Sequence, residues 1–261
     1  MFDCKERPSI FYTGRQLEFA QAIASIALKN NVRISQCHCP VLGSVQMIQG
    51  RPEIVLNQAQ EKALEDVFKV AQIWRVPSIV MHPFGIEEDW TDDLINDYFA
   101  VNHKHFSICI RHAKKYQTRI AIENMSKNSY YCKDPTELIQ LVDSLDCNYA
   151  GICLDTGHAL MAGYQPEQMA EQFAHRVIAL HIQDGNGYTD QHILPPFGHI
   201  NWQAFMQSLQ TIHYQGSLSF EINGHYIRKM SKITQQAFYG YACQYAHDML
   251  AMYSSEGQAR L

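Results

Sequence analysis

Six short apolar segments recur along this chain at intervals of about 25 to 45 residues, and a histidine or a carboxylate stands at or near the end of each one. Continuous apolar runs of this length are typical of parallel strands that are buried on both faces. Apolar residues at helical spacing lie between the runs, as in the segments Gly14 to Asn30, Asn57 to Trp74 and Thr91 to Tyr116. Strands that alternate with helices, without the Gly-rich turn of a dinucleotide-binding sheet, predict an α/β fold of the (β/α)8 TIM barrel type.

The length of the chain suits one such barrel. Its 261 residues, 46% of them hydrophobic, are enough for one large core, so residues 1–261 are expected to form a single domain. Only 33 residues precede the first convincing strand at Ile34, whereas a complete barrel needs two further strand–helix units there. We therefore expect the barrel to be abbreviated or incomplete at its N-terminal strands, unless the chain begins within a longer parent protein.

The run from Ala150 to Leu154 ends in Asp155-Thr156-Gly157-His158, where a loop is expected to begin. An Asp after a strand is commonly a helix N-cap, so Asp155 and His158 alone are weak evidence for a metal site. The other runs strengthen it, because the carboxyl ends of parallel strands meet at one edge, where ligands bind. The candidate ligands at these strand ends are His38, His82, Glu123, Asp155, His181 and Glu221.

Charge and composition restrict the kind of protein. The net charge of −5 argues against a nucleic-acid partner, because proteins that bind nucleic acids usually carry a basic surplus. The sequence has no N-terminal apolar signal and no run of 18 apolar residues, which predicts a soluble cytoplasmic protein without a membrane partner. The eight Cys residues show no CxxC spacing, so reduced and mostly buried thiols are expected. Strand alternation turns Cys37 and Cys39 away from the face that His38 occupies.

In combination, five spaced motifs resemble the xylose-isomerase-like TIM-barrel superfamily, which contains sugar and sugar-phosphate isomerases and epimerases and, more distantly, the endonuclease IV type of apurinic-site nuclease. The resemblance covers about residues 32–225. It implies that Glu123, Asp155, His181 and Glu221 hold a single divalent metal, and that His158 contacts substrate or a further metal. The motifs are Ile122-Glu123-Asn124-Met125, Asp155-Thr156-Gly157-His158, His181-Ile182-Gln183-Asp184, Asp190 to Trp202, and Phe220-Glu221-Ile222.

The same resemblance leaves a second function open. The endonuclease IV branch uses three metals, and its additional ligands match His38, His82, His158, Asp190 and His192. The loop from Asp190 to Trp202 resembles the isomerase and epimerase version instead, although Pro196 stands where Gly is usual. The acidic net charge points the same way. One metal or three therefore stays open at this point, with an endonuclease IV-like phosphodiesterase acting on apurinic DNA sites as the alternative.

The favoured function is a metal-dependent isomerase or epimerase of a small sugar or sugar phosphate. Removal of a proton beside a carbonyl leaves an enediolate, whose charge a divalent ion chelating two substrate oxygens stabilises. Mixed carboxylate and imidazole ligands suit Mn²⁺, Zn²⁺, Co²⁺ or Mg²⁺ without choosing among them. Glu123 and Glu221 are expected to remove and return the proton, and His158 to polarise a substrate oxygen. The identity of the sugar, the reacting carbon, a dehydratase outcome and a homodimer all stay open.

Overall fold

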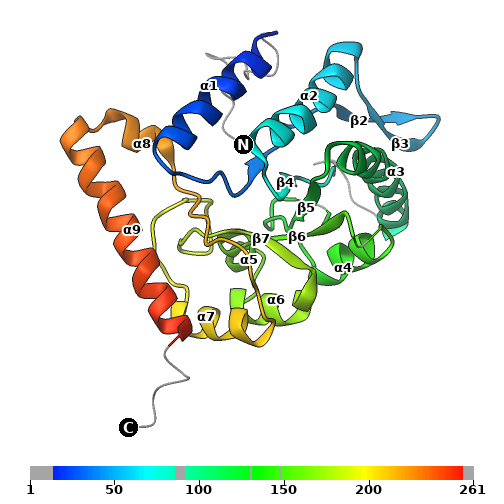
Figure 1. Ribbon diagram of the computed structural model, residues 1–261. Coiled ribbons are helices and arrows are strands. Elements are labelled where there is room, and N and C mark those ends of the chain that lie inside the picture. Colours follow the sequence, from blue (N-terminus) through cyan, green and yellow to red (C-terminus); the bar gives the residue numbers. More distant parts are fainter. Residues whose placement is uncertain (1–13, 86–91, 130, 147, 255–261) are drawn as a thin grey trace. The chain divides into compact units, whose positions relative to one another are not determined.

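A computed structural model describes residues 14–85, 92–129, 131–146 and 148–254 (Figure 1). Its internal contacts divide the chain into two units. The first contains residues up to 123 together with 137–151, and the second contains residues 124–136 together with those from 152 onward. We describe each unit by itself, and the single domain expected from the sequence stays a prediction.

The first unit holds most of the strands and the longest helix, α3. Its elements are α1 (Gln16–Lys29), β1 (Cys37–His38), β2 (Ser44–Ile48), β3 (Arg51–Val55), α2 (Gln58–Trp74), β4 (Ser78–Met81), α3 (Asp92–Tyr116), β5 (Arg119–Glu123) and most of α4 (Pro135–Asp143). The division falls within β6 (Ala150–Asp155). The second unit continues with α5 (Thr156–Met161), α6 (Pro166–Phe173), a 3-10 turn (Ala174–Arg176), β7 (Val177–His181), α7 (Trp202–Thr211), α8 (Gly224–Lys229) and α9 (Lys232–Ser254).

The main sheet confirms the predicted α/β class. Its strand order is β1-β4-β5-β6-β7, and the pairs β1–β4, β4–β5 and β6–β7 are parallel. Every residue of β4 and β6 is buried, as expected for strands that are covered on both faces. Helices connect successive strands, which is the connection that parallel pairing requires.

The structure modifies three of the predicted segments. The expected strand before Pro40 is only β1, and the expected strand at residues 216–222 is a single bridge between Ile182 and Phe220. After Asp155 the chain enters α5 directly, where a loop was expected. An antiparallel hairpin of β2 and β3, which the sequence reasoning did not assign, turns at Gln49 and Gly50. Both turn residues have positive φ angles, 52° and 77°, a combination typical of a tight hairpin turn.

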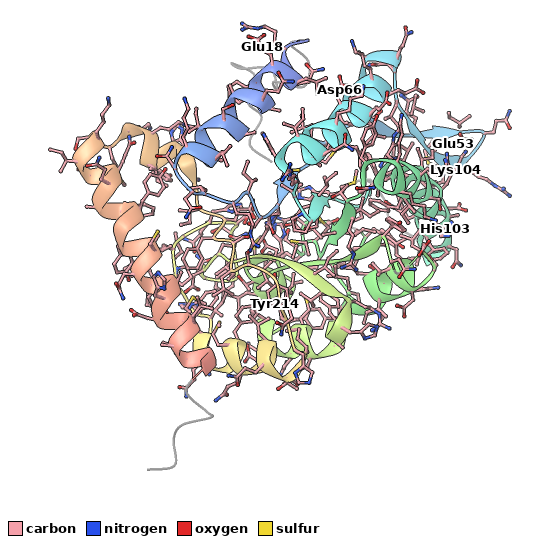
Figure 2. The ribbon with its side chains drawn as sticks, viewed as in Figure 1. Glu18, Glu53, Asp66, His103, Lys104 and Tyr214 are labelled. Carbon is pink, nitrogen blue, oxygen red and sulfur yellow. The ribbon has the colours of Figure 1, made fainter. Side chains whose placement is uncertain are left out.

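Buried polar contacts attach α1 to α2 in the first unit. Asp66 on α2 is 2% exposed and accepts hydrogen bonds from the amide of Gln16 and from Lys69 Nζ, the latter at 2.8 Å (Figure 2). The indole N–H of Trp74 donates to the Ala20 carbonyl at 2.9 Å. In the second unit, the buried Tyr214 donates its hydroxyl to the Ser217 carbonyl at 3.1 Å (Figure 2). Burial raises the pKa of Tyr214, so this hydroxyl stays protonated.

The predicted N-cap of α2 is confirmed and gives a first test. The Asn57 side chain accepts from Gln60 N at 3.0 Å, and the Gln60 side chain accepts from Asn57 N at 2.9 Å, forming a capping box. We expect Asn57→Ala to lower the free energy of unfolding by about 1 kcal/mol, because the backbone N–H of Gln60 loses its side-chain acceptor. Urea denaturation would measure the change. The exposed Gln58→Ala on the same turn is the matched control, and an equal loss in both variants would contradict the capping explanation.

None of the helices in the described parts of the chain is long and apolar enough to cross a membrane.

Candidate metal centre

Three strand-end residues meet in the second unit because of the backbone register. Asp155 at the end of β6 pairs with His181 at the end of β7. Glu221 follows the bridge to β7, and its N–H donates to the Ile182 carbonyl at 2.9 Å. One ligand atom from each of Asp155, His181 and Glu221 lies within 4.8 Å of the other two, and His181 Nδ1 is 3.0 Å from Glu221 Oε2. We call these three residues the Asp155 cluster.

The Asp155 cluster has the donors that a divalent ion prefers. Two carboxylates and an imidazole suit Mn²⁺, Zn²⁺ and Co²⁺, and with water also Mg²⁺. Asp155 is fully buried and His181 is 5% exposed. A buried carboxylate is costly unless hydrogen bonds or a cation compensate its charge. The residues present therefore fit a metal ion.

Hydrogen bonds with Asn124, just after β5, and with His158 on α5 fix the position of Asp155. Its N–H donates to Asn124 Oδ1 at 2.7 Å, and Asn124 Nδ2 donates to the Asp155 carbonyl at 3.0 Å. Its carboxylate Oδ1 accepts from His158 N at 2.6 Å, which makes Asp155 the N-cap of α5. Each carboxylate oxygen has two lone pairs, so capping a helix and binding a metal are compatible. The capping role is observed, and the ligand role stays a prediction.

A second group of titratable side chains lies in the same unit and is called the Asp190 cluster. Asp190 Oδ2 is 3.0 Å from His192 Nε2 and 3.7 Å from His158 Nε2. Burial by itself raises the pKa of Asp190, but hydrogen bonding and attraction to the two histidines outweigh it and hold the pKa well below its usual range. Burial lowers the pKa of His192, but the hydrogen bond and attraction to Asp190, together with attraction to Glu221 and Asp155, outweigh it and raise the pKa. One carboxylate thus lies beside two imidazoles, and the role of these three residues as metal ligands stays a prediction.

The first unit contains a third group, the Glu123 cluster. His38 Nε2 and His82 Nε2 are 3.2 Å apart, and Glu123 Oε2 lies 3.3 Å from the first and 3.2 Å from the second. Ligand atoms around a tetrahedral ion with bonds of about 2.0–2.1 Å are about 3.3 Å apart, so this triangle has the spacing of a ligand set. His38 donates through Nδ1 to the Cys39 carbonyl at 2.7 Å, a contact that directs Nε2 toward the cluster.

The two thiols next to His38 are not part of this cluster. Cys39 is buried and Cys37 is half-buried, while His38 reaches Glu123. Strand alternation allowed either His38 or the two thiols to face one site, and the structure has His38 there. Burial raises the pKa of Cys37 to about 12 and that of Cys39 well above its ordinary value, so both thiols stay protonated in the metal-free protein.

The predicted four-residue metal set is divided between the units. Asp155, His181 and Glu221 form the Asp155 cluster, while Glu123 belongs to the first unit. Glu123 is 1% exposed and directly precedes Asn124, the residue that pairs with Asp155. The participation of Glu123 in the Asp155 cluster stays a prediction.

The buried Asp184 holds the long loop that follows β7. The Asp184 carboxylate accepts from the Trp202 indole N–H at 2.9 Å, from Gly185 N at 2.9 Å and from Ile200 N at 3.3 Å. Its backbone forms an antiparallel bridge with Ile193. Gly198 lies so close that a Cβ there would stand 2.1 Å from Asp184 Oδ1, which explains a glycine at this position. Asp184 thus fixes the beginning and the end of the loop.

The tip of the loop folds on itself. The Asn186 side chain accepts from Tyr188 N at 2.9 Å and from Thr189 N at 3.1 Å. Tyr188 is 74% exposed, and Lys127 Nζ lies 5.5 Å from the centre of its ring. This short turn is independent of the contacts of Asp184.

Asn124, Gln183 and Asp184 stand within the sequence motifs, but the sequence alone assigns them no role. A signal was present, because each polar residue follows a predicted ligand by one to three positions at the end of an apolar strand. Each has a partner 16 to 31 residues away along the chain, which only the fold identifies.

Comparisons with known proteins agree with this architecture. An uncharacterized protein of Methanocaldococcus jannaschii, MJ1311, is 31% identical over 147 residues, which is 55% of this chain and 50% of that protein. The chain thus matches about half the length of this curated relative. A D-tagatose 3-epimerase-like protein has a similar structure, with a TM-score of 0.70, 21% identity and coverage of 90% of this chain and 85% of that one. The zinc-bound IolI protein has a TM-score of 0.70 at 14% identity, covering 91% and 82% of the two chains.

Residues 2–239 match the sequence model of one protein family, whose fold is a TIM barrel. The parallel strands and connecting helices of this chain are consistent with that fold. The chain belongs to the xylose isomerase-like TIM barrel family.

Proposed function

We propose that this protein is a divalent-metal-dependent isomerase or epimerase that transfers a proton in a small sugar or sugar phosphate. The observation that carries the proposal is the Asp155 cluster, which gathers two carboxylates and an imidazole at the ends of adjacent strands. Sugar epimerases among proteins of similar structure support the choice of reaction. A cytoplasmic location belongs to the same proposal, and a homodimer is compatible with it.

The proposed chemistry assigns a task to each acidic side chain. When bound, a divalent ion supplies a Lewis acid that stabilises negative charge on adjacent substrate oxygens. Glu221 is half-buried, with its carboxylate oxygens near His181 and His192, and it takes or returns the proton at a substrate carbon. Glu123, buried at the end of β5, transfers the proton on the opposite side of the sugar and completes the metal ligands.

His158 is the proposed electrophile. Its Nδ1 donates to the Asn124 carbonyl at 3.1 Å, which fixes the orientation of the ring. Its Nε2 lies 3.7 Å from Asp190 Oδ2, and when the ring carries a proton on both nitrogens this Nε2 donates a hydrogen bond to a substrate oxygen beside it. Such a bond stabilises the enediolate that forms when the proton leaves.

A second candidate function has its own specific support. The Glu123 cluster offers three possible ligands in addition to the Asp155 cluster, and the resemblance to endonuclease IV suggests His158, Asp190 and His192 as further ones. Several metals held together would suit the attack on a phosphodiester, because one ion activates the water and others stabilise the leaving oxygen. The alternative is therefore an endonuclease IV-like phosphodiesterase that acts on apurinic sites. The net charge of −5 weighs against it.

One experiment separates the two functions. Protein loaded with Mn²⁺ or Mg²⁺ is incubated in D₂O with ketoses, ketose phosphates and inosose-type polyols, and proton NMR follows deuterium at the carbon beside the carbonyl. We expect exchange with at least one compound, lost after chelation and restored by metal. Metal content is measured on the same sample. No exchange across the panel, with about three metals per chain and cleavage of an abasic DNA duplex, would replace the isomerase by the phosphodiesterase.

A further inference from the structure

Gln183 lies between the Asp155 cluster and the Asp190 cluster and contacts a member of each. Its side-chain Nε2 donates to both carboxylate oxygens of Asp155, at 3.1 Å from Oδ1 and 2.9 Å from Oδ2. Its Oε1 accepts from the backbone N–H of His192 at 3.1 Å. The residue is 1% exposed, so water does not compete for these bonds. One amide therefore joins a proposed ligand on β6 to the loop that carries another.

The backbone around Gln183 is locked as well. Gln183 N donates to the Thr156 hydroxyl at 3.0 Å, and this hydroxyl donates to the Gln183 carbonyl at 2.7 Å. A Cβ at Gly157 would stand 2.5 Å from Gln183 Cδ, so any larger residue at this position would displace the amide. The glycine of the Asp-Thr-Gly-His motif thus leaves space for Gln183.

The direction of the amide is fixed by its chemistry. An NH₂ group only donates and the amide oxygen only accepts, so the two ends are not interchangeable between a carboxylate and a backbone N–H. A reversed amide would place its oxygen against the Asp155 carboxylate and its NH₂ against the N–H of His192. The observed orientation is consequently the one in which the amide donates to both oxygens of the Asp155 carboxylate and fixes its position.

We propose that Gln183 is a positioning residue. It orients the Asp155 carboxylate for metal binding and fixes the position of the loop that carries His192 relative to this carboxylate. The inference rests on the proposed metal-dependent function and deepens it. Residues behind metal ligands orient them, and their loss typically weakens metal binding about 10- to 100-fold. Gln183 touches no substrate in this proposal.

Two variants separate the role of the donor NH₂ from that of the whole amide. Gln183→Met has a similar volume and removes both the donor and the acceptor. Gln183→Glu keeps an oxygen that can accept from His192 N, but at pH 8 its second oxygen is an acceptor placed against Asp155. Gln191→Met is the matched control, because it makes the same replacement in the same loop and removes only the bond from Asn186 N at 2.8 Å.

The readout is the dissociation constant for Mn²⁺, measured by calorimetric titration of each folded variant at pH 8, with circular dichroism melts to confirm folding. We expect about 10- to 100-fold weaker binding for both Gln183 variants and an unchanged constant for Gln191→Met. Wild-type affinity in Gln183→Glu would overturn the proposed role of donation to Asp155, and wild-type affinity in both Gln183 variants would overturn the inference entirely. Wild-type protein that binds neither Mn²⁺ nor Zn²⁺ would instead refute the proposed function, and the inference with it.

Discussion

Replacing Glu123 by Gln is expected to lower turnover by about 10³-fold or more without unfolding the protein. General acid–base groups typically contribute 10²- to 10⁴-fold, and an amide cannot take up a proton at neutral pH. The amide is also a weaker metal ligand than a carboxylate, so a loss of metal would add to the effect. Glu123 is 1% exposed and Gln has nearly the same shape, so the packing of β5 is expected to persist.

The measurement is the rate of deuterium exchange at saturating substrate, together with metal content per chain. Glu61→Gln on the exposed face of α2 makes the same chemical change in the same unit and serves as the control. We expect wild-type exchange in the control. A Glu123→Gln protein that retains both exchange and metal would remove Glu123 from the mechanism.

The second large effect concerns stability, and Asp184 is its source. Asp184→Ala is expected to lower the free energy of unfolding by about 3–5 kcal/mol, because three buried donors lose their acceptor at once. For a chain of this size the midpoint of thermal unfolding would fall by on the order of 10 °C. Trp202, 5% exposed, would then have an indole N–H without its carboxylate partner.

Two further variants identify which contact matters. Trp202→Phe removes only the indole donor and is expected to cost about 1–2 kcal/mol beyond the change in ring size. Asp184→Asn keeps an acceptor oxygen and is expected to fall between wild type and Asp184→Ala. Differential scanning calorimetry of the three variants would test this order. An Asp184→Ala protein as stable as wild type would show that the loop does not depend on the hydrogen bonds of the Asp184 carboxylate.

The sequence predicts best where a feature is local. The apolar run before Asp155 becomes β6 with every residue buried, since a continuous apolar strand fits only between two covered faces. Asn57 was recognisable as an N-cap because the capping box lies within four residues. The proximity of Asp155 and His181 was also predictable, because parallel strands deliver their last residues to one edge, while their role as ligands stays a prediction.

Non-local features escaped the sequence. The hairpin of β2 and β3 carries only a weak alternation around Gln49-Gly50, and its packing against α3 is visible only in three dimensions. The strand expected at Gly216 to Ile222 reduces to one bridge, because the backbone pairs with β7 only around Phe220. The role of Gln183 depends on Asp155, which lies 28 positions earlier, and nothing in the local pattern connects them.

In the loop after β7, the anchored residues and the tip are held by different contacts. Gln183 and Asp184 secure the loop at His192, Ile193 and Trp202, whereas the turn that begins at Asn186 closes through its own side chain. The Asn186 turn uses only the backbone N–H groups of Tyr188 and Thr189, so these two side chains can vary during evolution while His192, Ile193 and Trp202 keep their contacts. A library randomised at Tyr188 and Thr189 is expected to yield proteins that still fold.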